Sequence, residues 1–152
     1  MDRVINIDIN DKHDLYEPYN DNYLNKDLID YLIRQGMPFK KKDKVTIEVD
    51  NNVRKRKNFE QILKQSLKME KNRLQQKYRD MNKKQASWFI MGAIIILLGY
   101  IISESSALHE IIIVVGSVPI WEAISIELFK DTEIRKKIKV IDLLLKSQIK
   151  TI

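Results

Sequence analysis

The chain contains no cysteine, and among its 152 residues it has only two histidines, His13 and His109, and four glycines. Without cysteine there is no disulfide framework, no thiolate metal site and no cysteine nucleophile. Four glycines leave little material for a loop that cradles phosphate groups. The two histidines are predicted below to lie on opposite sides of a membrane, so they cannot form a dyad. We therefore expect no enzyme activity, no catalytic residue, no metal and no cofactor.

Lysine and arginine are absent from residues 88–129, although the chain carries 27 of them. This block holds two apolar segments, residues 88–103 and 108–129, which are joined by a short turn at 104–107. Each segment is close to the roughly 17 to 25 residues that a helix needs to cross a bilayer. A pair of buried core helices is the alternative interpretation.

The flanks of the two segments favour the membrane. Basic residues precede the first segment and follow the second, whereas the turn between them has none. Short loops rich in Lys and Arg stay in the cytoplasm, so the pattern predicts a hairpin with both termini cytoplasmic. The net charge of +6 and the pI near 9.4 then indicate attraction to anionic membrane lipids. Nucleic acid is not expected as a partner, because no nucleic-acid motif is recognisable. Residues 1–11 do not have the pattern of a cleavable signal peptide.

Residues 1–51 have the pattern of a small cytosolic β-α-β module. Apolar residues alternate with polar ones in RVINIDIN (3–10) and in KVTIEVD (44–50), as in half-buried strands. Between these strands, apolar residues at helical spacing predict a helix with Asn25 as its N-cap and Gly36 as its C-terminal stop. The order of elements favours a parallel pair of strands. Because two strands alone make a marginal sheet, the module is expected to pack on another element or to pair with another copy.

Two charged segments surround the apolar block. Residues 52–87 contain no glycine or proline and have a narrow apolar seam, which predicts a long stalk helix that runs into the first span. Residues 130–152 predict an amphipathic cytosolic C-terminal helix. This tail either lies on the membrane surface or packs antiparallel on the stalk, and we favour packing because isolated charged helices are marginal.

The second span carries polar residues that a membrane helix normally avoids. Glu122 lies about 12 Å from Lys130 along a helix, too deep to reach the interface easily. It either is protonated, or hydrogen-bonds to Ser125 or to the backbone freed by Pro119, or faces other subunits around a central axis. Pro119 predicts a kink near Gly116. In the first span, Gly92 and Gly99 share one face and are expected to pack against the second span.

The stretch HDLYEPYNDNYLNKDLIDYL (13–32), the strand KVTIEVD and the element IWEAISIELF (120–129) resemble a family of small, uncharacterised bacterial two-span membrane proteins. The family pattern often has an acidic residue where this chain has Ser125. The resemblance implies the two-span architecture and no catalytic residue. The positions that match its first element are Asp14, Leu15, Tyr16, Pro18, Tyr19, Leu24 and Asn25. Their simplest role is a structured loop and helix start, and the alternative is a partner-binding loop that includes Asp14, Tyr16 and Tyr19.

The fold class expected from these patterns is a membrane α-helical hairpin of two transmembrane helices, with a small cytosolic β-α-β module and a long helical stalk. We expect a self-associating protein of the bacterial inner (cytoplasmic) membrane whose module recruits or senses a cytosolic protein partner. The alternative is an oligomeric effector that disrupts or permeabilises the membrane, with Glu122 lining the path.

Overall fold

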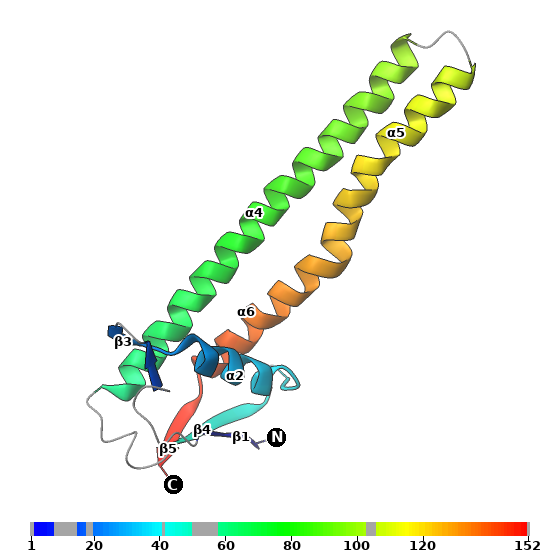
Figure 1. Ribbon diagram of the computed structural model, residues 1–152. Coiled ribbons are helices and arrows are strands. Elements are labelled where there is room, and N and C mark those ends of the chain that lie inside the picture. The colour runs from blue at the N-terminus through cyan, green and yellow to red at the C-terminus, as the bar shows by residue number, and fades with distance from the viewer. Residues whose placement is uncertain are drawn as a thin grey trace. The chain divides into compact units, whose positions relative to one another are not determined.

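A computed structural model describes residues 2–7, 15–17, 20–40, 42–49, 58–102 and 106–151 (Figure 1). The chain divides into two compact units. Unit 1 comprises Met1–Leu74 with Lys136–Ile152, and unit 2 comprises Gln75–Arg135. Helix α4 (Phe59–Ile102) and helix α6 (Thr132–Leu144) each contribute residues to both units. The chain is mostly helical, with a small parallel three-stranded sheet in unit 1.

The sheet of unit 1 consists of β1 (Asp2–Ile7), β4 (Lys44–Val49) and β5 (Gln148–Thr151), in the order β1-β4-β5. Both pairings are parallel, and they place Ile5 beside Ile47 and Ile47 beside Ile149. Alternate residues of a strand point to opposite faces, and the apolar set of β1 and β4 is buried on one of them. The parallel β1–β4 pair follows from the two alternating sequences and the helix between them.

The third strand corrects the prediction for the C-terminal tail. Residues 130–152 do not form one helix, because α6 ends at Leu144 and a tight turn leads into β5. Ile141, Leu145 and Ile149 fit a helical repeat, but the alternation in Gln148–Thr151 also fits a strand. Pairing with β4 decides the outcome, since β4 would otherwise have an unpaired edge. The two-stranded sheet expected from the sequence is therefore completed by the chain's own tail.

Helix α2 (Lys26–Gly36) and a small antiparallel ladder of β2 (Tyr16–Glu17) and β3 (Asn20–Leu24) complete the N-terminal part. The Asn25 side chain accepts a hydrogen bond from the Asp27 amide at 3.0 Å, as expected of an N-cap. Gly36 is still helical, and Met37 is the C-cap in a right-handed conformation. Gly36 is therefore not the left-handed stop that its position suggested.

The core of unit 1 joins segments that are far apart in sequence. Its largest fully buried side chains, among the described residues, are Leu15, Leu24, Leu32, Ile47, Val49, Leu63, Leu67 and Ile141. The buried Ser66 hydroxyl on α4 accepts a hydrogen bond from the Leu24 amide at 2.9 Å, and Lys71 Nζ of α4 lies 2.6 Å from Asp142 Oδ1 of α6. The part of α4 that belongs to unit 1 therefore packs against α6 and is not an isolated stalk.

Unit 2 contains the rest of α4, helix α5 (Ser106–Ser125), the π-helical turn η1 (Ile126–Asp131) and the start of α6. Where the sequence predicted a stalk that continues into an apolar helix, α4 runs without a break from Phe59 to Ile102. Residues 52–57 of the predicted stalk lie outside the described residues. Helix α5 begins at Ser106, inside the turn expected at 104–107 and two residues before the predicted start of the second apolar segment.

Candidate functional site

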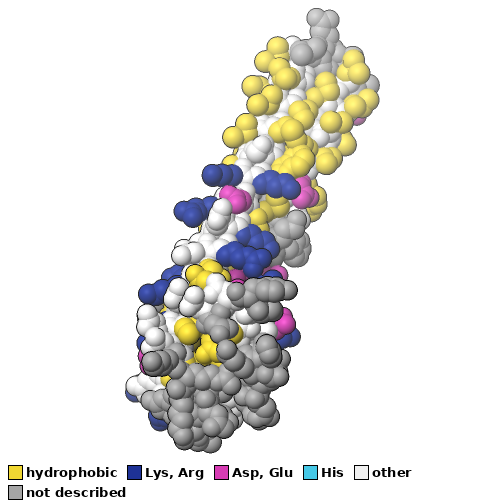
Figure 2. All heavy atoms as spheres, turned by 60° about the vertical axis from the view of Figure 1, so that its left-hand side comes forward, with side chains coloured by type: hydrophobic (Ala, Val, Ile, Leu, Met, Phe, Trp, Pro, Cys, Tyr) yellow, Lys and Arg dark blue, Asp and Glu magenta, His cyan; other side chains and the backbone are white. Residues whose placement is uncertain are grey.

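Two helices are long and apolar enough to cross a membrane by length and composition. In α4, only 11% of the most apolar 18-residue stretch is buried. In the second helical segment, Leu108–Leu144, which begins within α5, only 22% of the corresponding stretch is buried. Side chains such as Leu97 (62% exposed), Val118 (64%) and Trp121 (72%) lie on the surface. Figure 2 shows hydrophobic side chains over much of the visible face of this part of the protein. An apolar surface this extensive is unusual on a soluble monomer.

The two apolar helices contact each other through glycines. A Cβ atom on Gly92 would lie 2.6 Å from Ile120 Cγ1, and one on Gly116 would lie 2.5 Å from Ile96 Cγ1. Gly99 is packed equally closely on Ile112. As the position advances along α4, its contact moves backward along α5, so the two helices are antiparallel. Gly92 and Gly99 lie on the shared face that their spacing predicted.

Pro119 lies inside α5, and the helix continues past it to Ser125. Proline has no amide hydrogen, so the carbonyl of Val115 loses its usual donor. Pro119 and Gly116 are both buried, which places them on the side of α5 that contacts α4. Two residues before the proline, the Ser117 hydroxyl donates a hydrogen bond to the Val114 carbonyl at 2.7 Å. This carbonyl is the neighbour of the one that loses its donor, so the bond satisfies the serine hydroxyl within the helix and does not replace the missing bond.

Glu122 lies on a different side of α5. Its side chain is exposed, whereas Pro119 and Ala123 are buried. Val118 and Ser125, at four positions before and three after, are its neighbours on the helix surface. Ser125 is half-buried. Among the described residues Glu122 has no hydrogen bond or ion pair, so the contact with Ser125 considered from the sequence is not present.

A second carboxylate, Glu127, does have a partner. Gln85 Nε2 of α4 donates a hydrogen bond to Glu127 Oε2 at 3.0 Å. Glu127 belongs to η1, where the wider helical turn accommodates an extra residue and changes the direction in which side chains point. No pattern in the sequence predicted this π-helical turn.

The residues considered for a partner-binding loop are described only in part. Asp14 and Tyr19 lie outside the described residues. Tyr16 is buried at 6% exposure in β2 and pairs with Leu24 of β3. A buried side chain offers little to a partner, so Tyr16 fits the structural role of this stretch better than the binding role.

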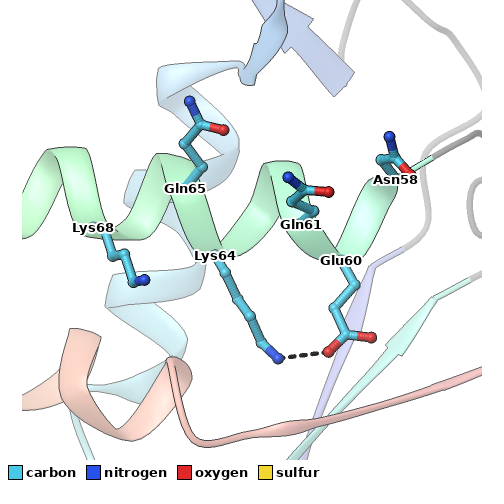
Figure 3. A pocket seen from close by; sticks show the side chains of 6 residues that line it. All are labelled: Asn58, Glu60, Gln61, Lys64, Gln65 and Lys68. Atoms are coloured by element: carbon cyan, nitrogen blue, oxygen red, sulfur yellow. Dashed lines mark hydrogen bonds and ion pairs between the residues drawn. The ribbon is translucent and has the colours of Figure 1, made fainter.

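Unit 1 has a shallow pocket at the start of α4, with a volume of about 610 Å³. It is lined by Asn58, Glu60, Gln61, Lys64, Gln65 and Lys68. Figure 3 shows these side chains along the first turns of α4, with Lys64 bonded to Glu60. Because Glu60 and Lys64 pair with each other and leave only the charge of Lys68, the pocket offers no group of charges that would hold a ligand. No group of three potential metal ligands occurs in the part of the chain that the structure describes.

Comparisons with known proteins give no relative: no family model, no curated protein and no solved structure matches the chain. The resemblance to a family of bacterial two-span proteins stays a prediction.

Proposed function

We propose that the chain is a two-span protein of the bacterial inner membrane that associates with itself and whose N-terminal module recruits a cytosolic protein partner. The apolar part of α4 and helix α5 form the membrane hairpin, and both termini face the cytoplasm. Unit 1 is the cytosolic module, with the C-terminal strand β5 built into its sheet.

The observation that carries this proposal is the exposure of the apolar helix pair. A core helix of a soluble protein would be mostly buried, whereas most of each apolar window here is exposed. Lipid is the environment in which such a surface is stable. The basic residues on both flanks and their absence from 88–129 support the orientation.

The support for self-association is Glu122. An intramembrane carboxylate is costly unless it meets a polar partner or water, and Glu122 has no partner within the described part of its own chain. A second copy that presents the same face of α5 would supply one. The open sheet edge is a weaker argument than the sequence suggested, because β5 covers one edge of β4.

The topology is tested with single cysteines, which are clean probes because the chain has none of its own. Ser105→Cys in the predicted external turn should react with a membrane-impermeant maleimide in intact cells. Lys139→Cys, at an exposed position of α6, should react only after lysis. Labelling of both positions in intact cells would refute the orientation.

The exposed position of Glu122 also favours a second candidate function, a membrane-permeabilising effector. In an oligomer whose α5 helices surround an axis, this carboxylate would line an aqueous path. Dye release from liposomes that contain the purified protein tests the candidate. Tight liposomes at all protein densities would leave the recruiting module as the function.

A further inference from the structure

Unit 1 contains a second cavity, of about 480 Å³, at the end of the sheet where β4 and β5 begin. Lys44 and Thr46 of β4, Gln148 and Lys150 of β5, and Lys146 of the preceding turn line it. Its remaining lining residues are Asp2, Asp43, Val45 and Leu143. A volume of this size falls in the range of small-molecule sites, about 300–1,000 Å³.

Among the residues that the structure describes, no ion pair is formed by Lys44, Lys146 or Lys150. Two carboxylates, Asp2 and Asp43, also line the cavity, and Asp2 lies opposite Lys44 in the β1–β4 ladder. Asp43 is already engaged elsewhere, since its Oδ2 accepts a hydrogen bond from the Lys40 amide at 2.9 Å and lies 3.7 Å from Arg3 Nε. The Lys40 amide, with a smaller contribution from Arg3, lowers the pKa of Asp43, so this carboxyl is ionised at neutral pH.

The strand register brings the donors together. Thr46 is the direct partner of Gln148 in the parallel ladder, and Lys44 and Lys150 each lie two residues from one of them. Residues two apart on a strand share a face. One face of β4 and β5 therefore presents two ammonium groups, a hydroxyl, a carboxamide and the carboxylate of Glu48, which is the direct partner of Lys150. Lys146, in the turn before β5, adds a third ammonium group to the lining of the cavity.

We propose that this cavity binds an anion that carries a phosphate group with at least two negative charges. Ammonium groups bind phosphate as point charges, and charge-assisted hydrogen bonds to it are stronger than neutral ones. The described lining residues include no aromatic side chain on which a base would stack, so recognition rests on the phosphate. This inference does not depend on membrane insertion of the helix pair.

The phosphate has two potential sources, a soluble phosphorylated compound or the headgroup of an anionic lipid. Both sources present the same phosphate group to the cavity. They differ only in whether the module would respond to a soluble compound or to a membrane lipid. Soluble pyrophosphate and phosphatidic acid are the two probes that separate these sources.

The test uses the full chain in a neutral detergent and in nanodiscs. Isothermal titration with sodium pyrophosphate, against sodium chloride of matched ionic strength, should give saturable binding. The combined variant Lys44→Gln, Lys146→Gln, Lys150→Gln should bind at least about tenfold more weakly, since three charge pairs at exposed sites are lost. In nanodiscs, phosphatidic acid should compete with pyrophosphate if the lipid is the source and leave its binding unchanged if the ligand is soluble.

The matched control removes the same charge at Lys26, Lys68 and Lys139, which are exposed lysines of unit 1 outside the cavity. It should bind pyrophosphate as the wild type does. An equal loss in both variants, or no saturable binding by the wild type to either probe, would overturn the proposal. If the triple variant does not fold, Lys146→Gln alone should still weaken binding measurably, and unchanged binding would count against the site.

Discussion

Gly92 and Gly116 face each other across the apolar helix pair: a Cβ atom on Gly92 would lie 2.7 Å from the carbonyl oxygen of Gly116, and one on Gly116 would lie 3.2 Å from that of Gly92. The contact is reciprocal and involves backbone on both sides. Backbone atoms cannot move aside as a flexible side chain can, so the close approach of α4 and α5 requires a residue without a side chain at both positions.

A side chain at Gly92 should therefore separate the two helices. We expect Gly92→Val to lower the free energy of unfolding by about 1–3 kcal/mol, the usual cost of overpacking. Titration of the protein with sodium dodecyl sulfate in mixed micelles, followed by tryptophan fluorescence, measures this value. Ala93→Val places the same valine side chain at the neighbouring position, which is exposed. This control should have little effect. Equal effects of the two changes would mean that α4 and α5 do not pack through Gly92.

Gly36 plays a comparable part in unit 1. A Cβ atom there would lie 2.5 Å from Cγ1 of Val140, a buried residue of α6 with a stiff side chain. Alanine would gain helix propensity of about 1 kcal/mol over glycine, but the clash should outweigh this gain. We expect Gly36→Ala to destabilise unit 1, and to do so less in a Val140→Ala background. A double-mutant cycle from thermal unfolding gives this coupling, and additive effects would contradict the contact.

The sequence predicted the local parts of unit 1 better than its long-range pairings. The Asn25 cap and the parallel β1–β4 pair follow from periodicity and from the rule for crossovers. Strand β5 was not predicted because its isoleucine continues a helical repeat, and its partner β4 lies about a hundred positions earlier. The contact of Gly36 with Val140 is also long-range and was not predicted. No local pattern distinguishes a glycine that ends a helix from a glycine that packs against another helix.

The packing of α4 on α6 in unit 1 gives a third prediction. Leu67 and Ile141 are completely buried, and truncation of such a side chain costs about 2–5 kcal/mol. Leu67→Ala and Ile141→Ala should each lower the unfolding temperature of unit 1. Met69→Ala, at a position of α4 that is 45% exposed, is the control and should be nearly neutral. If α6 instead lay on lipid, Ile141→Ala would weaken vesicle binding and leave the unfolding temperature unchanged.

For the candidate sites, composition and spacing could identify Glu122 and the glycines, but not what surrounds them. Glu122 is conspicuous because it is a carboxylate in an apolar run. Its exposed position could not be predicted, because it depends on which side of α5 packs against α4 through the glycines. The cavity with Lys44, Lys146 and Lys150 could not be predicted, because these residues come together only when β5 joins the sheet. In a chain with 27 basic residues, three lysines carry no distinguishing pattern.

The last prediction concerns Glu122, for which the two proposed functions give different outcomes. Glutamine keeps the shape and the hydrogen-bonding capacity of glutamate but removes the charge, whereas leucine removes both. If Glu122 hydrogen-bonds to a second copy, Glu122→Gln should preserve the oligomer and Glu122→Leu should weaken it by about 1 kcal/mol, the usual value of a polar contact between membrane helices. Light scattering corrected for bound detergent measures this change. Glu110→Gln, an exposed position near the other end of α5, is the control.

If Glu122 instead lines an aqueous path, Glu122→Gln should still assemble but change the rate or the ion selectivity of leakage from liposomes, because the charge itself acts on the passing ion. Leakage and oligomer size are measured on the same preparations, so that a loss of assembly is not mistaken for a closed path. A wild type that leaks, with Glu122→Gln and Glu122→Leu leaking identically, would show that the path does not involve this residue. A wild-type protein that is monomeric in detergent and in liposomes would contradict self-association itself.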